Sequence, residues 1–267
     1  MKISVIVVTL NSGNDLIKTV DSVLLQKKAE YEIIIKDGGS TDGSIEQLPK
    51  DERIAIYNTK DSGIYSAMNQ AIQYVTGEYC LFMNTGDIFF DENVLSKIEC
   101  YLKKADYTQN LIYYGDCFTE NRNSTLKYPD RFDDYVCFTM ILCHQATIYP
   151  TWMLKERQFS LDYKVAADYE YYVHAYTHGT QLKHLPITIV RYKGDGASEK
   201  PQNRKKALKE SQAIRKKCFT KKRYWKTWLK TQLHGVGFKH MLVQQEWFYP
   251  VYKKIARKYY DWKNRKG

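Results

Sequence analysis

The chain has 267 residues, 43% of them hydrophobic and 27% charged, which suits a globular protein with a sizeable core. No apolar run reaches the roughly 18 residues that a membrane-spanning helix needs. The apolar run at the amino terminus ends at Asn11 and Ser12, which is too early for an export signal. The six cysteines show no CxxC spacing, which disfavours a zinc site or a disulfide framework. We therefore expect reduced thiols and a cytoplasmic location.

The net charge of +11 is divided unevenly along the chain. Residues 201–267 contain 20 Lys and Arg against 3 Asp and Glu, a balance of +17. Residues 1–200 contain 21 against 27, a balance of −6. An acidic body with a basic tail indicates two roles, with chemistry in the body and docking in the tail.

The first half of the chain alternates apolar, strand-like runs with helical patterns. Strands are predicted at residues 3–10, 31–36, 53–58 and 78–84, and helices at 12–26 and 63–75. Ser12 or Asn14 is expected to cap the first helix. This alternation predicts a mostly parallel sheet covered on both faces. In such sheets ligands bind at the carboxyl ends of the strands, where this sequence places polar residues.

The pattern is less regular after about residue 105. Short strand-like pieces at 111–116, 124–129 and 146–150 precede a predicted helix at 168–179 and a predicted strand at 185–192. The change in charge makes residue 200 the natural boundary of the tail.

Residues 35–44 read IKDGGSTDGS and directly follow a predicted buried strand. The glycines permit positive φ angles and a close approach of the backbone to a ligand. Asp37, at the end of the strand, could accept hydrogen bonds from a nucleobase or a sugar. The alternative is a solvated turn in which Asp42 or Ser44 caps the next helix.

A second polar turn, NTGD at residues 84–87, follows the strand at 78–84. A carboxylate in this position, that of Asp87, can bind a hard divalent cation through oxygen. The alternative is an ordinary acid in a turn.

Four segments together are more informative than either turn alone. ISVIVVTLNSG, EIIIKDGGSTDGS, DSGIYSAMNQAI and GEYCLFMNTGD resemble the nucleotide-sugar domain of glycosyltransferase family 2, the inverting GT-A group. The resemblance is greatest to members that assemble bacterial capsule, colanic-acid-like or O-antigen polysaccharides. It is strong over residues 1–95 and continues weakly to about residue 200. It implies an α/β GT-A fold: a Rossmann-like nucleotide-sugar half at 1–105, an acceptor-binding and catalytic half at 106–200, and the basic helical tail at 201–267.

The resemblance also implies which residues contact the nucleotide-sugar. They are Thr9, Asn11, Asp37, Gly38, Ser40, Asp61, Gly63, Asn69, Asn84 and Asp87. Asp87 would contact both the diphosphate and a divalent metal, Mn²⁺ or Mg²⁺. Arg191, beside a glycine-containing loop, could clamp the diphosphate, because a cation stabilises the charge of a leaving group. An ordinary exposed loop is the alternative for Arg191.

Asp168 and Glu170 lie near the start of the predicted helix at 168–179 and point to different faces. The resemblance makes Asp168 the general base that removes the proton of the acceptor hydroxyl. The alternative is that Asp168 caps the helix, with Glu170 as the reserve base. His144 would lie near the acceptor or the diphosphate, although a lone histidine is more often structural.

The tail has aromatic and aliphatic residues at helical spacing over 248–262 with lysines on the other faces, and KKRYWKTWLK at 221–230 is similar. Such a basic amphipathic helix can lie in the interface of an anionic membrane. The alternatives are a helix packed on the body and a nucleic-acid-binding helix. Because no nucleic-acid-binding motif is present, we expect no nucleic-acid partner.

The sequence thus predicts an inverting transferase that moves a sugar from a UDP-sugar to a hydroxyl of a lipid-linked oligosaccharide. We expect it to act in cell-surface polysaccharide synthesis, on the cytoplasmic face of the inner membrane. Ser66 and the single acid of NTGD keep one alternative open, a catalytically inactive nucleotide-binding scaffold. A nucleic-acid-binding protein that uses the basic tail is a further alternative.

Overall fold

The structure is a computed structural model that describes residues 1–104, 109–194 and 201–233. Its strands are β1 (Lys2–Thr9), β2 (Glu30–Asp37), β3 (Ile54–Asn58), β4 (Tyr79–Asn84), β5 (Ile88–Phe89), β6 (Leu111–Thr119), β7 (Ser124–Leu126), β8 (Thr147–Pro150) and β9 (Gln181–Tyr192). Its helices are α1 (Asn14–Leu24), α2 (Ile64–Ile72), α3 (Val94–Leu102), α4 (Asp134–Thr139), α5 (Thr151–Glu156), α6 (Ala167–Thr177), α7 (Pro201–Cys218) and α8 (Lys221–Leu233). Short 3₁₀ turns lie at η1 (Glu120–Arg122) and η2 (His144–Ala146).

The strands form one mixed, nine-stranded sheet in the order β3-β2-β1-β4-β8-β6-β9-β5, with β7 beside β6. Strands β1 to β4 are mutually parallel, β8 joins β4 in the antiparallel sense, and β6 and β9 are parallel to each other. The sheet therefore runs through both predicted halves of the body.

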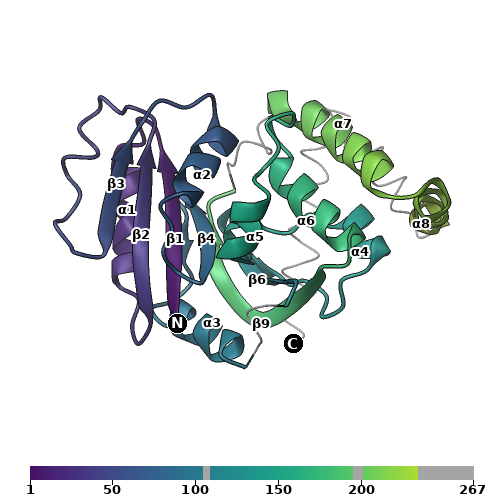
Figure 1. The fold of residues 1–267 in the computed structure, drawn as a ribbon, viewed down its shortest axis with the longest axis horizontal. Helices are drawn as coiled ribbons and strands as arrows, with labels where there is room; N and C mark the ends of the chain where they lie inside the picture. Colours follow the sequence, from purple (N-terminus) through teal and green to yellow (C-terminus); the bar gives the residue numbers. More distant parts are fainter. Residues whose placement is uncertain (105–108, 195–200, 234–267) are drawn as a thin grey trace.

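The parallel part of the sheet is buried on both faces, as the apolar runs predict. Strand β1 is almost entirely buried, and α1 and α2 lie on opposite faces of these strands (Figure 1). Helix α1 faces the core with Leu16, Val20 and Val23, which recur at helical spacing. The predicted alternation of strands and helices is thus present in the structure.

The register of the sheet brings three strand ends to one edge. Thr9 pairs with Asp37 between β1 and β2, and Val8 pairs with Asn84 between β1 and β4. Strands β6 and β9 run in the same direction as β4, so their carboxyl ends reach this edge too. Polar residues that are far apart in the sequence are thereby gathered in one place.

The opposite edge of the sheet carries a partly buried polar cluster around the Glu32 carboxylate. Its oxygens lie 2.7 Å from Lys2 Nζ and accept hydrogen bonds from the Ser4 hydroxyl at 2.5 Å and the Thr76 backbone N–H at 2.7 Å. Burial raises the pKa of Glu32, but the hydrogen bonds from Lys2, Ser4 and Thr76 outweigh it and lower the pKa to about 2. The cluster joins β1, β2 and the turn before β4.

The described part of the tail forms two helices, which lie at the end of the molecule away from β1 and β3 (Figure 1). Helix α7 packs on α6, and α8 packs on α4. The carboxylate of Glu210 in α7 accepts hydrogen bonds from the backbone N–H groups of Lys164, Val165 and Ala166 at 3.0 to 3.1 Å. In α8, Arg223 pairs with Asp134 of α4.

The helix predicted over 248–262 lies outside the described residues. Among the residues that the structure describes, no helix is both long and apolar enough to cross a bilayer.

Candidate active site

Two loops at the carboxyl edge of the sheet are tied to each other through side chains. The backbone N–H of Asn11 donates to the Ser40 hydroxyl at 2.9 Å, and Asn11 Oδ1 accepts from the backbone N–H of Thr41 at 2.8 Å. Asn11 has a positive φ of 50°, which asparagine tolerates better than most residues. These hydrogen bonds join the loop at 37–44 to the turn after β1, and the two together are called the rim below.

Asp37 is fully buried, and its carboxylate turns back onto the loop. Both oxygens accept from the Ser40 backbone N–H at 3.0 Å, and Oδ1 also accepts from the Ser40 hydroxyl at 2.6 Å. In this structure Asp37 holds the loop in shape. Its predicted contact with the base stays a prediction.

The capping predictions made for this region are wrong. Helix α1 begins after Gly13, which has no side chain to cap with, so neither Ser12 nor Asn14 is the cap. Asp42 Oδ2 instead accepts from the Gly13 backbone N–H at 2.8 Å. The residues after Asp42 form turns and not a helix, and Ser44 donates to Asp42 Oδ1 at 2.6 Å.

Asp61 lies beside the same rim, above a buried lysine. A side chain at position 38 would not fit here, because a Cβ on Gly38 would stand 2.9 Å from Asp61 Oδ2. The other oxygen of Asp61 accepts from the backbone N–H of Gly63 at 3.0 Å, and Lys36 Nζ lies 3.4 Å from Oδ2. Gly38 and Gly63 thus both lie beside Asp61, and the predicted contacts of these three residues with the nucleotide-sugar stay predictions.

Asp87 lies at the end of β4 with 3% of its surface exposed. Its Oδ2 accepts from Gln145 Nε2 at 2.5 Å, and its Oδ1 accepts from the backbone N–H of Lys193 at 3.0 Å. The Lys193 side chain reaches Asp15 Oδ2 at 3.1 Å, and this hydrogen bond lowers the pKa of Asp15. The residues that follow β9 are thereby attached to the end of β4.

The oxygen donors near Asp87 make a partial ligand set for a divalent cation. Within the described ranges, no group of three or more His, Cys, Asp or Glu side chains could hold a metal ion. The Asn84 side-chain oxygen, three residues before Asp87, is buried without a hydrogen-bond partner. Asn84 and Asp87 therefore suit a cation whose remaining ligands come from a diphosphate, as magnesium sites commonly do.

Two residues assigned to the nucleotide-sugar have other partners in the structure. The guanidinium of Arg191 lies over the rings of Phe90 and Phe118, with 4.8 and 5.2 Å to the ring centres. Asn69 is buried, and its amide donates to the Phe159 carbonyl at 2.8 Å and accepts from the Phe159 N–H at 2.9 Å. Arg191 thus lies over two neighbouring aromatic rings, and Asn69 fastens the Phe159 backbone to α2.

Asp168 lies on the first turn of α6, where it accepts a hydrogen bond from the Tyr65 hydroxyl to Oδ1 at 2.9 Å. Helix α6 begins after Ala166, so Asp168 lies inside the helix and does not cap it. Tyr65 is the second residue of α2, two positions after Gly63. This contact brings the predicted base to the edge of the sheet that carries the two loops.

His144 faces the second oxygen of Asp168, with 4.0 Å between Nδ1 and Oδ2. Its ring stacks on Phe82 of β4 with 4.9 Å between ring centres. Both ring nitrogens are buried without a hydrogen-bond partner. Burial lowers the pKa of His144, and the charge of Asp168 only partly opposes this, so the ring is neutral near pH 7.

Glu170 is not a reserve base. It is 2% exposed, and both of its oxygens accept from Arg157 Nη2, at 2.6 and 2.7 Å. Asp168 and Glu170 point to different faces of α6, as their spacing predicts, and the face of Glu170 is the structural one.

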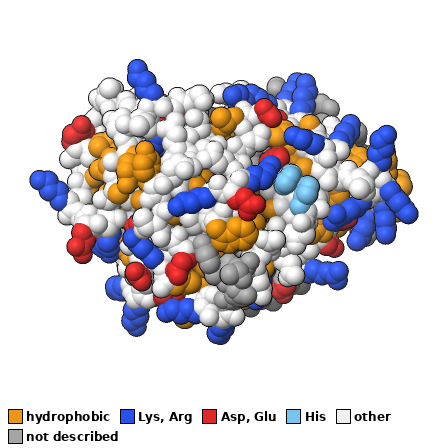
Figure 2. Space-filling view, in the orientation of Figure 1, with side chains coloured by type: hydrophobic (Ala, Val, Ile, Leu, Met, Phe, Trp, Pro, Cys, Tyr) orange, Lys and Arg blue, Asp and Glu red, His pale blue; other side chains and the backbone are white. Residues whose placement is uncertain are grey.

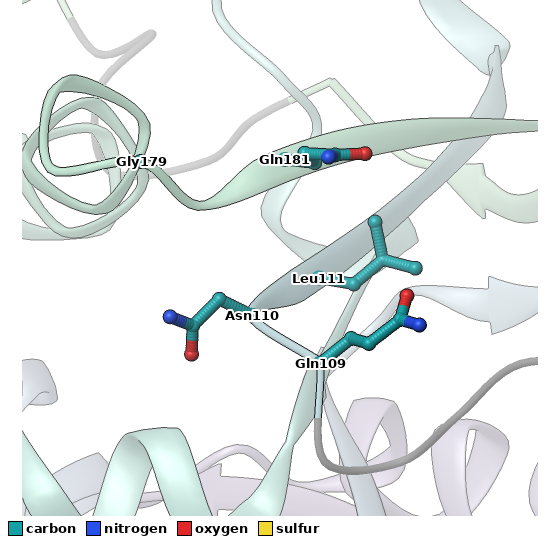
Figure 3. A pocket seen from close by; sticks show the side chains of 5 residues that line it. All are labelled: Gln109, Asn110, Leu111, Gly179 and Gln181. Carbon is teal, nitrogen blue, oxygen red and sulfur yellow. The ribbon is translucent and has the colours of Figure 1, made fainter.

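A separate hollow lies at the other edge of the sheet (Figure 3). Gln109, Asn110 and Leu111 line it from the amino end of β6, and Gly179 and Gln181 line it from the amino end of β9. None of these five lining residues is charged, and the hollow is remote from the rim and from Asp87.

Four residues of this region were not predicted from the sequence: Tyr65, Gln145, Lys193 and Glu210. Each contacts a residue that is distant in the sequence. Tyr65 contacts Asp168, and Gln145 contacts Asp87. Lys193 contacts Asp87 and Asp15, and Glu210 contacts the turn before α6. Tyr65 and Lys193 lie inside segments that the resemblance covers. Glu210 carried no such signal, because it lies in the tail.

Comparison with known proteins gives this arrangement a family. Residues 4–161, more than half of the chain, match the model of the glycosyl transferase family 2. A PGL/p-HBAD biosynthesis glycosyltransferase of Mycobacterium bovis is 27% identical over 196 residues, which are 71% of this chain and 72% of that protein. An uncharacterized glycosyltransferase of Rickettsia felis is 37% identical over 105 residues, 38% of this chain and 17% of that protein.

Solved structures share the fold. S. aureus TarS 1–349 in complex with UDP-GlcNAc superposes with a TM-score of 0.61 at 19% identity, over 80% of this chain and 66% of that one. The mannosyltransferase PcManGT from Pyrobaculum calidifontis, in complex with GDP-Man and Mn²⁺, superposes with a TM-score of 0.59 at 16% identity, over 96% of this chain and 85% of that one. The predicted GT-A fold is confirmed. The match over more than half of its length shows that this chain belongs to glycosyltransferase family 2, and it is a glycosyltransferase.

Proposed function

We propose that the chain transfers a sugar with inversion from a nucleoside diphosphate sugar, with UDP as the nucleotide, to a hydroxyl of a lipid-linked oligosaccharide. The observation that carries the proposal is the position of Asp168. Its carboxylate is held at the edge where the turn after β1, the loop at 37–44 and the NTGD turn come together. The carboxylate of Asp168 is thus joined to α2, the helix that follows Asp61 and Gly63.

The residues present can supply the steps of such a reaction. The loop at 37–44 offers backbone groups and Asp61 a carboxylate to the nucleotide. Asp168 Oδ2 accepts the proton of the acceptor hydroxyl as the hydroxyl oxygen attacks the anomeric carbon from the side opposite the diphosphate. His144, neutral and without a hydrogen-bond partner, offers a second polar contact to the acceptor. Bonding to one face while the diphosphate leaves from the other inverts the configuration.

A bound divalent cation, Mn²⁺ or Mg²⁺, would neutralise negative charge on the diphosphate. Asn84 and Asp87 are the residues that would hold it. The Mn²⁺ and GDP-Man in the PcManGT structure and the UDP-GlcNAc in the TarS structure support a nucleotide-sugar donor and a metal for this fold.

We further propose that the chain acts in cell-surface polysaccharide synthesis. We propose that it docks on the cytoplasmic face of an anionic membrane. Helix α8 supports this, because its outward side combines lysines with exposed tryptophan and leucine. Figure 2 shows Lys and Arg side chains beside hydrophobic ones at the end of the molecule that α7 and α8 form.

The test combines nucleotide binding with transfer. Calorimetric titration of UDP, with GDP and CDP as controls, should show binding of UDP that strengthens with Mn²⁺. Asp168→Asn should abolish transfer from a UDP-sugar and spare UDP binding. If Asp168→Asn still transfers sugar, the assignment of the base is wrong. If the unmodified chain binds UDP but neither transfers nor slowly hydrolyses any donor, the alternative of an inactive scaffold is correct.

A further inference from the structure

The carboxylate of Asp168 has its two oxygens in different surroundings. Oδ1 accepts the hydrogen bond from Tyr65 at 2.9 Å, whereas Oδ2 faces His144 Nδ1 across 4.0 Å. A gap of 4.0 Å is too long for a direct hydrogen bond. Oδ1 is therefore hydrogen-bonded, whereas Oδ2 faces the imidazole of His144, which has no hydrogen-bond partner.

The partner of Oδ1 is itself well fixed. Tyr65 is 9% exposed, and its ring contacts Phe159 with 5.9 Å between ring centres. Its hydroxyl has a second acceptor within reach, the Val165 carbonyl at 3.0 Å. A hydroxyl has one proton to donate, and an ionised carboxylate is the stronger acceptor of the two.

The Tyr65 hydroxyl stays protonated at any pH at which the enzyme would work. Burial raises the pKa of Tyr65 well above 10, and the nearby charge of Asp168 raises it further. Tyr65 is thus a permanent donor, whose hydrogen bond orients the carboxylate of Asp168.

We propose that Tyr65 is a positioning residue for the transfer reaction, which holds Oδ1 of Asp168 so that Oδ2 is presented to the acceptor hydroxyl between Asp168 and His144. The inference rests on the proposed function, because it needs Asp168 to be the base. It assigns a chemical role to a residue of the GIYSAMN segment that makes a contact with the catalytic half of the chain.

Other ionisable groups also face this carboxylate. His144 lies in η2, Tyr149 in β8 and Tyr172 on α6. Burial raises the pKa values of both tyrosines, and the Asp168 charge adds to the effect. The pKa of His144 is lowered by burial. The test must therefore compare variants that leave these three groups unchanged.

Tyr65→Phe removes the hydroxyl and keeps the ring, and Tyr169→Phe is the matched control. Tyr169 lies on the same helix as Asp168, is 1% exposed, and donates to the Cys137 carbonyl at 2.6 Å. Both variants lose one buried tyrosine hydrogen bond, but only Tyr65→Phe loses a contact with Asp168. Thermal unfolding and UDP titration should show that both fold and bind the nucleotide.

In Tyr65→Phe we expect kcat for transfer to fall by about 10- to 100-fold with little change in KM for the donor, because the base is less well oriented. Tyr169→Phe should change neither quantity.

Equal kcat values for the unmodified chain and Tyr65→Phe would overturn this inference alone. Equal losses of kcat in Tyr65→Phe and Tyr169→Phe would show a structural role and overturn it as well. A chain that binds UDP and transfers nothing before any substitution would overturn the proposed function and this inference together.

Discussion

Gln145 and Asp87 lie 58 positions apart in the sequence and are joined by a hydrogen bond of 2.5 Å from Nε2 to Oδ2. The contact links the turn before β8 to the end of β4, so the second half of the body completes the surroundings of the acid in NTGD. It also fixes the direction in which a buried carboxylate points, which matters for any cation that shares it.

Gln145→Leu tests this link. The variant removes the hydrogen bond that Gln145 Nε2 donates to the buried Asp87 Oδ2, so we expect a loss of about 1–3 kcal/mol in the free energy of unfolding. Mn²⁺-dependent UDP binding should weaken by about 10- to 100-fold, as outer-shell substitutions at metal sites typically do. Denaturant unfolding and calorimetry measure the two effects.

The matched control is Gln26→Leu. Gln26 is also buried, at 6% exposure, and lies away from the rim. Its side-chain amide donates to the Asp91 carbonyl at 2.7 Å and accepts from the Leu95 N–H at 3.0 Å. Gln26→Leu should lower stability by a similar amount and leave UDP binding unchanged. If Mn²⁺ strengthens UDP binding in Gln145→Leu as much as in the unmodified chain, Gln145 does not support the metal site.

Glu170→Gln tests whether the two acids on α6, Asp168 and Glu170, have different roles, one catalytic and one structural. The change weakens a buried ion pair with Arg157, and we expect it to cost about 1–3 kcal/mol of stability. Since Glu170 faces away from Asp168, kcat per folded molecule should stay within about twofold of the unmodified value. Transfer assays below the unfolding temperature measure this. A large fall in kcat with normal stability would return Glu170 to the list of catalytic candidates.

The main features of the sheet could be predicted from the sequence because burial on both faces leaves an unbroken apolar run. Residues 3–10 and 78–84 are examples, and the polar residues directly after them mark the carboxyl edge. The resemblance to a family singled out Asp168 as the candidate base, and that role stays a prediction. Such local signals do not depend on how distant segments meet.

Partners of side chains could not be predicted in the same way. The sequence predicts that Arg191 clamps a diphosphate, and this stays a prediction, but it gave no sign that the guanidinium lies over Phe90 and Phe118, which come from different segments. Asn69 and Glu170 likewise form hydrogen bonds with residues 90 and 13 positions away, Phe159 and Arg157. Nothing in the sequence around a polar residue states whether its partner is a ligand or another part of the chain.

The Glu32 cluster predicts a pH dependence of stability that is independent of catalysis. Because the pKa of Glu32 is about 2 in the folded state and 4.5 is its ordinary value, the ionised form is stabilised by folding. This contribution is complete above about pH 4.5 and is lost as the pH falls toward 2. We expect it to be about 1–3 kcal/mol after allowance for solvent screening.

Glu32→Gln isolates that contribution. The difference in unfolding free energy between the variant and the unmodified chain should be largest at pH 6–7 and shrink steadily below about pH 4.5. Urea unfolding at a series of pH values measures it. Glu30→Gln, on the same strand but with an exposed side chain, is the control and should show little pH-dependent difference. A gap that is constant from pH 7 to pH 3 would contradict the assignment.

Helix α8 turns its small and polar side toward the protein and its tryptophans outward. Tyr224, Thr227 and Thr231 are buried, whereas Trp225, Leu229 and Leu233 are 55%, 55% and 86% exposed. Exposed lysines lie among these apolar residues. Tryptophan and lysine together suit the interface of an anionic bilayer, where the ring meets the acyl boundary and the ammonium meets lipid phosphate.

We therefore expect the full chain to sediment with phosphatidylglycerol vesicles, much less with phosphatidylcholine vesicles, and less in high salt. Trp225→Ser should weaken vesicle binding by about tenfold, because the lost apolar contact is worth roughly 1–2 kcal/mol. Leu25→Ser is the control, since Leu25 is 63% exposed at the end of α1, far along the chain from α8. Vesicle binding that is equal in Trp225→Ser and Leu25→Ser would assign docking to another surface. The absence of any preference for anionic lipid would reject membrane docking through charge, and concentration-dependent self-association lost in Trp225→Ser would make a second copy the partner of α8.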